Sequence, residues 1–190
     1  MNAYEGTIEV ICGPMFCGKS EELIRRVRRA TIARQRVAVF KPDIDNRYAL
    51  NAVMSHSKVS VTALSVHNLT ALMEVVHSSH DPEVVAIDEA QFLGDDLAAR
   101  CNILANEGRR VLVAGLDMDY EGKPFDNMAE LMARAEEVTK LSAICLACGE
   151  PATRSFRKTA GTERVEIGDA KVYEARCRKC HVKGQIDERC

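Results

Sequence analysis

Short apolar runs alternate with segments of helical periodicity along most of the chain, up to about Leu141. The runs Val37–Phe40, Val84–Ile87 and Val111–Ala114 are continuous and mostly β-branched. Runs of this kind are typical of central strands in a parallel sheet that is covered on both faces. Thr7–Cys12 is a further run that we expect to be a buried strand.

Helical patterns lie between these runs. Apolar residues recur at helical spacing from Leu23 to Ala30, and we expect the arginines between Arg25 and Arg29 to form a solvated helix face. The other expected helices lie near Asn68–His77, Asp95–Glu107 and Asn127–Glu136, with Asn68 and Asp95 as N-caps.

The segment between the first strand and the first helix carries a phosphate-binding motif. It matches GxxxxGK[ST], and its position after a strand and before a helix is the context that the motif requires. Glycines let several backbone N–H groups converge on one anion, and the helix N-terminus adds a partial positive charge. We expect Lys19 to reach the β- and γ-phosphates and Ser20 to join a Mg²⁺ shell. The motif reads Gly13-Pro14-Met15-Phe16-Cys17-Gly18-Lys19-Ser20.

Together, motif and alternation predict a P-loop, RecA-like α/β fold, in which a parallel sheet carries helices on both faces. After Leu141, cysteine pairs, glycines and short extended segments replace the helices. We therefore expect a nucleotide-binding domain over residues 1–141 and a small zinc-ribbon domain over residues 142–190. Lys41–Ser60 is polar and irregular, which suits a functional loop.

Two acids follow the strand Val84–Ile87. A carboxylate at the end of such a strand lies beside the phosphate loop, and we assign Asp88 to hold Mg²⁺, partly through water. Glu89 is then available as a general base on an attacking oxygen. Asp88-Glu89-Ala90-Gln91 also resembles helicase motifs, but helicases need two motor domains and this chain has room for one.

Composition narrows the class of protein. The chain has 190 residues, is 46% hydrophobic and carries a formal net charge of −2, which gives no general attraction to nucleic acid or to anionic membranes. Its first residues lack the pattern of a signal peptide, and no apolar run is long enough to cross a bilayer. We expect a cytoplasmic protein, in which the eight cysteines are thiols or metal ligands rather than disulfides.

Four of the cysteines form two CxxC pairs, Cys145/Cys148 and Cys177/Cys180. Four thiolates suit a closed tetrahedral Zn²⁺ site, which is structural because no coordination position remains open. A redox function of either pair is the alternative, and His181 is a less favoured substitute for Cys180. Cys12, Cys101 and Cys190 are expected to be buried or tail thiols. Cys17 is either a small residue in a tight turn or a thiol sensitive to oxidation.

These motifs, in this order, resemble the zinc-containing (type II) thymidine kinases over almost the full length of the chain. The resemblance implies ATP-dependent phosphorylation of the thymidine 5′-hydroxyl, and a homotetramer inhibited by dTTP. Besides the phosphate loop and the CxxC pairs, the matching pieces are Phe40–Tyr48, Ser55-His56, Asp88–Phe92, Gly115–Asp117, Lys123–Phe125, Ile167-Gly168 and Tyr173.

The resemblance also implies residue roles. Glu89 takes the position of the general base, and Arg47 is expected to neutralise charge that develops during phosphoryl transfer. Ser155 is expected close to the thymine ring. The remaining phosphate-site positions are Asp45, Asn46, Ala90 and Gln91. The nucleoside pocket is walled by Met15, Phe92, Leu116, Tyr120 and Phe125, although Phe92 and Phe125 are alternatively ordinary core residues. A lasso loop that covers the base matches Arg164, Val165, Glu166, Ile167, Gly168 and Tyr173.

The chain departs from the common family pattern at Cys17, Ser20, Tyr120, Ser155 and Asp169, and none of these changes removes a catalytic group. A different class of protein is the second hypothesis: a P-loop ATPase whose zinc ribbon binds nucleic acid. Residues 142–190 carry more basic than acidic residues, which favours it, but they contain few aromatic residues for base stacking. We therefore expect thymidine and ATP as partners, with no nucleic acid and no membrane.

Overall fold

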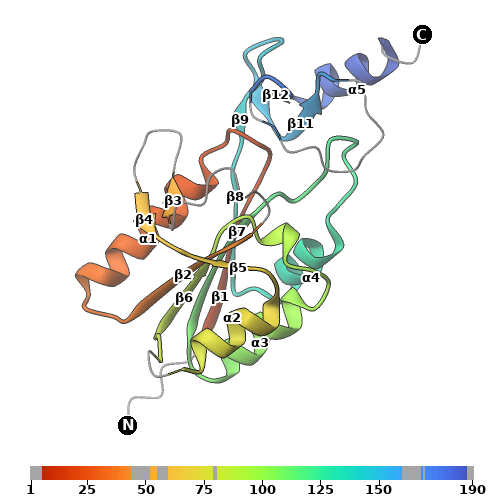
Figure 1. The fold of residues 1–190 in the computed structure, drawn as a ribbon. Helices are drawn as coiled ribbons and strands as arrows, with labels where there is room; N and C mark the ends of the chain where they lie inside the picture. Colours follow the sequence, from red (N-terminus) through yellow and green to blue (C-terminus); the bar gives the residue numbers. More distant parts are fainter. Residues whose placement is uncertain are drawn as a thin grey trace.

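The protein is a six-stranded sheet with helices on both faces, extended at one end by a module of short strands and one helix (Figure 1). The computed structural model describes residues 6–43, 52–54, 60–78, 81–159, 168 and 170–187. The strands of the sheet are β1 (Thr7–Cys12), β2 (Val37–Pro42), β5 (Leu64–Val66), β6 (Val84–Ile87), β7 (Arg110–Gly115) and β8 (Glu137–Lys140).

The strand order is β5-β2-β6-β7-β1-β8, and all neighbouring pairs are parallel. In this order β7 lies between β1, which precedes the phosphate loop, and β6, which precedes Asp88. Because the carboxyl ends of parallel strands share one edge of the sheet, the loops after β1, β6 and β7 meet there.

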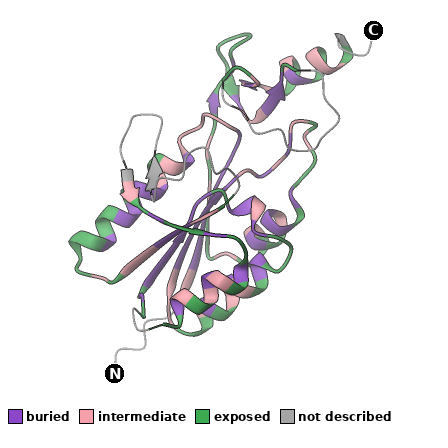
Figure 2. Ribbon diagram, in the orientation of Figure 1, coloured by how far each residue is buried: buried purple, intermediate pink, exposed green. Residues whose placement is uncertain are grey.

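Alternate residues of the strands pack on opposite faces of the sheet. On one face Ile11 and Leu112 belong to a buried cluster with apolar residues of α1 (Lys19–Ile32). On the other face Val10 and Val111 belong to a cluster with apolar residues of α2 (Leu69–Val76), α3 (Leu97–Asn106) and α4 (Asp126–Arg134). Figure 2 shows that the strands are largely buried while the outer sides of the helices are exposed. A short 3₁₀ helix, η2 (Ala90–Phe92), follows β6.

The predicted α/β fold is confirmed, and the expected helices are found within a few residues of their predicted ends. Asn68 caps α2 as expected, since its Oδ1 accepts a hydrogen bond from the backbone N–H of Ala71 at 2.8 Å. The expected cap Asp95 is wrong: α3 follows Asp96, and neither side chain caps it with a hydrogen bond. Asp95 lies one residue earlier, in the turn that leads into the helix.

Two expectations about irregular segments need correction. Lys41–Ser60 is not irregular throughout, because β2 runs to Pro42 and an antiparallel hairpin joins β3 (Ala52–Met54) to β4 (Ser60–Thr62). The C-terminal module also contains a helix, α5 (Arg178–Asp187). Its periodicity is weak because its inward side presents His181 and Gly184, which pack beside Phe156, rather than large aliphatic residues.

The rest of this module consists of two small antiparallel pairs. They are β9 (Ala143–Ile144) with β10 (Pro151–Ala152), and β11 (Arg154–Arg157) with β12 (Tyr173–Arg176). Across the described part of the chain, every helix is too short or too polar to cross a membrane.

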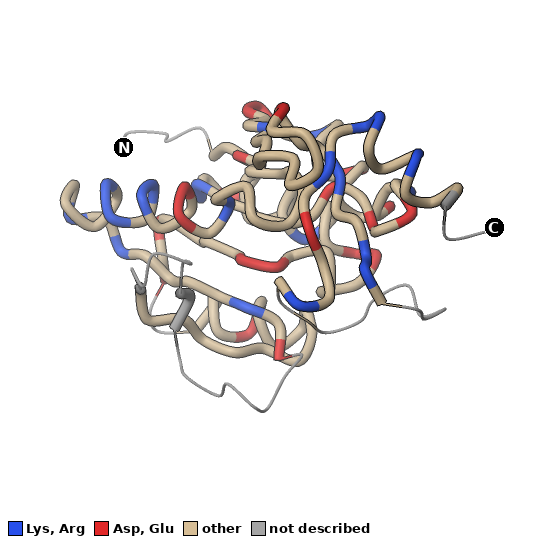
Figure 3. Tube along the Cα trace, turned by 90° about the horizontal axis from the view of Figure 1, so that it is seen from above, with Lys and Arg blue, Asp and Glu red and all other residues tan. Residues whose placement is uncertain are grey.

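The arginine cluster of α1 is only partly a solvated face. Figure 3 shows basic residues on successive turns of this helix, and Arg25, Arg28 and Arg29 are exposed. Arg26 instead is buried, with its guanidinium 2.6 Å from Glu9 in β1, 2.8 Å from Glu22 and 2.9 Å from Glu137 in β8. The expectation was wrong for Arg26 because helical periodicity does not reveal that acids on two strands face this position.

Candidate nucleotide and metal sites

The phosphate loop connects β1 to α1 and requires glycine at two points. Gly13 and Gly18 have φ angles of 142° and 86°, in the left-handed region that residues with a Cβ avoid. A Cβ at Gly13 would also lie 2.5 Å from the carbonyl oxygen of Leu141. Lys19 is buried, and its Nζ donates a hydrogen bond to the Pro14 carbonyl at 2.7 Å, so the ammonium group lies over the loop.

Asp88 lies next to this loop, at the end of β6. It is buried, and the Ser20 hydroxyl donates a hydrogen bond to its carboxylate. Burial raises the pKa of Asp88, and the neighbouring charge of Glu89 raises it further. A carboxylate in this environment is more easily ionised next to a cation, and Ser20 and Asp88 together offer the oxygen ligands that Mg²⁺ prefers. The residues present therefore fit a magnesium site.

Glu89 is exposed in the turn between β6 and η2. Its φ angle is 50°, an unusual backbone conformation for a residue with a side chain, and such strain is often found at functional sites. Gln91 holds the carboxylate: its Nε2 donates to Glu89 Oε2 at 2.7 Å. The other end of the same amide, Oε1, accepts from the Leu116 backbone N–H at 2.9 Å.

Gln91 thus connects the turn after β6 to the loop after β7. It is buried, and a Cβ at Gly115 would lie 2.8 Å from its Oε1, so Gly115 leaves room for this amide. Asn127 supports the same turn, donating to the carbonyl oxygens of Gln91 at 3.2 Å and of Gly94 at 3.0 Å. The sequence predicts Gln91 at the phosphate site, which stays a prediction; in the structure its amide bonds Glu89 and Leu116.

The residues expected to surround the nucleoside lie partly in the α/β unit and partly in the C-terminal module. Phe92 and Phe125 form an edge-to-face pair with ring centroids 6.4 Å apart, and Phe125 belongs to the core. Ser155, on β11, accepts a hydrogen bond from the Met15 backbone N–H at 3.0 Å, which joins the C-terminal module to the phosphate loop.

Tyr120 and Tyr173 are both associated with Arg157. The Arg157 guanidinium lies 3.6 Å from the centroid of the Tyr120 ring, in a cation–π geometry. Tyr173 is buried in β12 and is the cross-strand partner of Arg157. Gly168 is among the described residues, and a Cβ at this position would collide with the Val172 side chain. The expected site residues Asp45, Asn46, Arg47, Arg164, Val165, Glu166 and Ile167 lie outside the described residues.

Asp117 lies at the start of the loop that follows β7, and the sequence analysis assigned it no role beyond its place in the matching piece Gly115–Asp117. It is buried, and its Oδ2 lies 2.7 Å from Lys140 Nζ. The contact is an ion pair by distance and lacks the direction of a hydrogen bond. An acid shortly after a buried strand, the signal that identified Asp88, points to this residue too.

The environments of the two thiols near Asp117 favour the protonated form. Burial and the charge of Asp117 raise the pKa of Cys12 to about 11, and burial also raises the pKa of Cys17. Because the thiolate is the reactive form, these environments disfavour an oxidation-sensitive Cys17.

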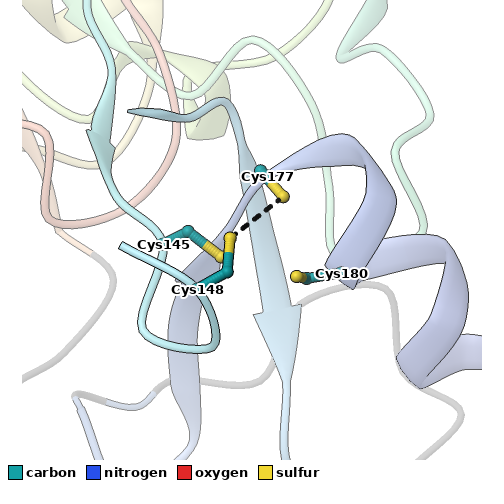
Figure 4. Close-up of side chains that lie close together, drawn as sticks. All are labelled: Cys145, Cys148, Cys177 and Cys180. Carbon is teal, nitrogen blue, oxygen red and sulfur yellow. Dashed lines mark hydrogen bonds between the residues drawn. The ribbon is translucent and has the colours of Figure 1, made fainter. Parts of the chain in front are cut away.

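The four cysteines of the CxxC pairs converge, with all sulfur atoms within 4.8 Å of one another (Figure 4). Cys145 and Cys148 come from the turn between β9 and β10, and Cys177 and Cys180 from the start of α5. The Cys148 and Cys177 sulfurs are 3.7 Å apart. Tetrahedral zinc with bonds of about 2.3 Å requires about 3.8 Å between sulfurs, so the cluster fits this ion.

The electrostatics of Cys145 also suit a metal ligand. Burial acts to raise its pKa, but hydrogen bonds involving the backbone of Cys177, Ala147 and Cys148 lower it to about 6. His181 is not part of the cluster: it is buried, and its Nε2 lies 2.8 Å from the Tyr120 carbonyl oxygen. Burial lowers the pKa of His181, while its interactions with the backbone of Tyr120 and Ser155 oppose that change.

A glycine loop that leads into a helix, with a buried acid at the end of a nearby parallel strand, defines the class of P-loop nucleotide-binding proteins. Within this class, the family description "Thymidine kinase" matches residues 6–181, so the chain belongs to the thymidine kinase family, a family of phosphotransferases.

Among solved structures, the flagellar accessory protein FlaH from Methanocaldococcus jannaschii is similar to this chain, with a TM-score of 0.53 and 14% sequence identity. The match covers 77% of this chain and 75% of that chain. At this identity the likeness concerns the fold alone.

Proposed function

We propose that the protein transfers the γ-phosphoryl group of ATP to the 5′-hydroxyl of thymidine and forms dTMP and ADP. The observation that carries this proposal is Glu89, an exposed carboxylate in a left-handed turn directly after Asp88, held by the Gln91 amide. We assign this carboxylate to accept a proton beside a bound triphosphate, and membership of the thymidine kinase family supports thymidine and ATP as the substrates.

Each group has a defined task in this reaction. The phosphate loop and Lys19 bind the ATP phosphates. Ser20 and Asp88 would hold Mg²⁺, whose charge would offset that of the phosphates. Glu89 takes the proton of the 5′-hydroxyl while the oxygen–phosphorus bond forms and the bond to the ADP oxygen breaks. Asp45, Asn46 and Arg47 complete the phosphate site, with Arg47 stabilising the charge that develops during transfer.

The C-terminal module supplies the nucleoside side of the site in this proposal. The four cysteines would hold Zn²⁺, which would cross-link the turn between β9 and β10 to the start of α5, in the module that carries Ser155 and Tyr173. The lasso loop between these two residues, including residues 164–168, covers the thymine and excludes water from the transfer. Amide exchange of residues 155–159 and 170–173 should slow when thymidine is added, and unchanged exchange there contradicts this lid.

The alternative, a P-loop ATPase with a nucleic-acid-binding ribbon, has little support. Stacking of single-stranded bases needs exposed aromatic rings, but Phe156 and Tyr173 are both buried. We also propose a cytoplasmic homotetramer that dTTP inhibits by occupying the substrate site, which gel filtration and inhibition by dTTP would test.

The test is conversion of labelled thymidine to dTMP in the presence of ATP and Mg²⁺, with Glu89→Gln as the diagnostic variant. Loss of a positioned base should lower kcat by a factor of about 10² to 10⁴ and leave ATP binding nearly intact. Glu74→Gln, at an exposed position of α2, is the matched control and should retain full activity. Full kcat in Glu89→Gln contradicts the assignment of the base, and absence of dTMP with the wild-type protein contradicts the reaction.

A further inference from the structure

The loop between β7 and α4 carries Leu116 and Tyr120, two of the residues expected at the nucleoside. Its tip is a compact turn, in which Asp119 Oδ1 accepts hydrogen bonds from the backbone N–H groups of Glu121 at 3.0 Å and Lys123 at 2.9 Å. These bonds set the shape of the tip but do not attach it to the sheet. Its position in the protein therefore depends on contacts with other segments.

Those contacts come from the C-terminal module. His181 Nε2 lies 2.8 Å from the Tyr120 carbonyl oxygen, and Gln185 Nε2 lies 3.5 Å from the same oxygen. Arg157 stacks on the Tyr120 ring, and Arg154 contacts the sulfur of Met118 at 3.7 Å. The shortest of the contacts to the loop backbone is made by the histidine.

The His181 ring is itself firmly placed. It directly follows Cys180, and its backbone N–H donates to the Cys177 carbonyl at 2.9 Å, so it belongs to the helical turn that begins in the second CxxC pair. Its ring packs edge-to-face against Phe156, with centroids 5.9 Å apart, and only 2% of the residue is exposed. The histidine thus connects the cysteine cluster to the loop through a short and rigid path.

We propose that His181 is a positioning residue, which fixes residues 118–124 through the Tyr120 carbonyl and so couples the cysteine cluster to nucleoside binding. The proposal rests on the proposed function in one respect, namely that this loop lines the thymidine site. His181 touches no reacting atom, so its substitution should change the KM for thymidine rather than the KM for ATP.

Two substitutions separate the hydrogen bond from the packing of the ring. His181→Phe keeps a planar ring against Phe156 but removes the donor. His181→Gln retains an N–H donor at a similar distance from the backbone, because its amide nitrogen takes the place of Nε2. Val182→Ala, at an exposed neighbouring position on α5, is the matched control.

The measurements are zinc content, thermal stability, the KM for thymidine and for ATP, and amide exchange of residues 118–124. We expect His181→Phe to keep its zinc and its KM for ATP, to raise the KM for thymidine about three- to tenfold, and to exchange faster at residues 118–124. His181→Gln should restore most of the thymidine KM and the slow exchange, and Val182→Ala should resemble the wild type.

Unchanged thymidine KM and unchanged exchange in His181→Phe would overturn the proposal. Loss of zinc in a folded His181→Phe variant would also overturn it, because the histidine would then act on the metal rather than on the loop. If the wild-type protein does not phosphorylate thymidine, the proposed function fails. The exchange of residues 118–124 still decides in that case whether His181 holds the loop.

Discussion

At the scale of single residues, the arrangement around Glu89 depends on a side chain that makes two contacts at once. Gln91 donates to Glu89 and accepts from the Leu116 backbone, so one buried amide orders both the proposed base and the loop on the nucleoside side. A group held in this way loses little freedom when substrate binds, which is the advantage of a preorganised site.

Replacing Gln91 by methionine should therefore lower kcat by about tenfold, because Glu89 loses the hydrogen bond that orients it. The KM for ATP should change little, and the melting temperature should fall because the Leu116 N–H loses its acceptor. Steady-state kinetics and thermal unfolding test this. Gln35→Met is the control for the same chemical change at a half-buried position distant from the site, and equal kinetics in the two variants would contradict the positioning of Glu89 by Gln91.

At the scale of elements, ion pairs attach α1 to the sheet. Arg26 is shared by Glu9, Glu22 and Glu137, and Glu9 also pairs with Arg110 at 2.6 Å. Burial acts to raise the pKa of Glu9, but its bonds to Arg110 and Arg26 prevail and hold it below its ordinary value. The bond to Arg25, together with that to Arg26, lowers the pKa of Glu22 to about 2.

A carboxylate whose pKa is lower in the folded than in the unfolded protein stabilises the fold above its unfolded pKa, and this stabilisation is lost as the pH falls through the folded pKa. For Glu22 the window runs from about pH 4.5 down to about pH 2. Glu22→Gln should therefore reduce the free energy of unfolding at neutral pH, and its difference from the wild type should shrink on acidification within this window.

Urea unfolding from about pH 7 to about pH 3 measures this difference. Glu74→Gln, which removes an exposed acid of α2, is the control for the loss of one negative charge. A constant difference between Glu22→Gln and the wild type over the whole range would show that the pairs do not couple protonation to stability.

At the scale of the whole molecule, the C-terminal module meets the α/β unit at two points of the proposed site. Ser155 accepts a hydrogen bond from the phosphate loop at Met15, and His181 contacts the loop after β7 at Tyr120. The cysteine cluster brings together the two parts of the module that make these connections, because it joins the turn between β9 and β10 to the start of α5. If zinc occupies this cluster as proposed, its removal should weaken thymidine binding, even though the cluster would take no part in phosphoryl transfer.

Metal analysis should give one zinc per chain, and Cys148→Ser should lose it together with thermal stability, since a tetrahedral site with one ligand removed binds far more weakly. The KM for thymidine should rise much more than the KM for ATP. Cys190→Ser, which removes a thiol outside the set of four, should keep both zinc and kinetics. Full zinc occupancy in the double variant Cys177→Ala, Cys180→Ala would refute the ligand set.

The sequence by itself determined the α/β fold, because apolar runs and helical periodicity are local signals whose meaning does not depend on distant residues. Thr7–Cys12 and Val84–Ile87 are strands where the pattern predicts them, and the cysteines of the two CxxC pairs converge as their spacing predicts. Motif spacing likewise indicated that Ser20 and Asp88 would meet, since strand ends share one edge of a parallel sheet. The roles of the site residues remain predictions.

Only the tertiary structure decided which polar groups meet across long sequence separations. The burial of Arg26, the bond from the Leu116 N–H to Gln91 and the contact of His181 with Tyr120 leave no periodic trace in the sequence. The sequence did not predict the helix α5 for the same reason. Its inward side is recognisable only from the residues against which it packs, such as Phe156. Such contacts depend on how separate segments are placed in space, and a local pattern of apolar and polar residues carries no information about that.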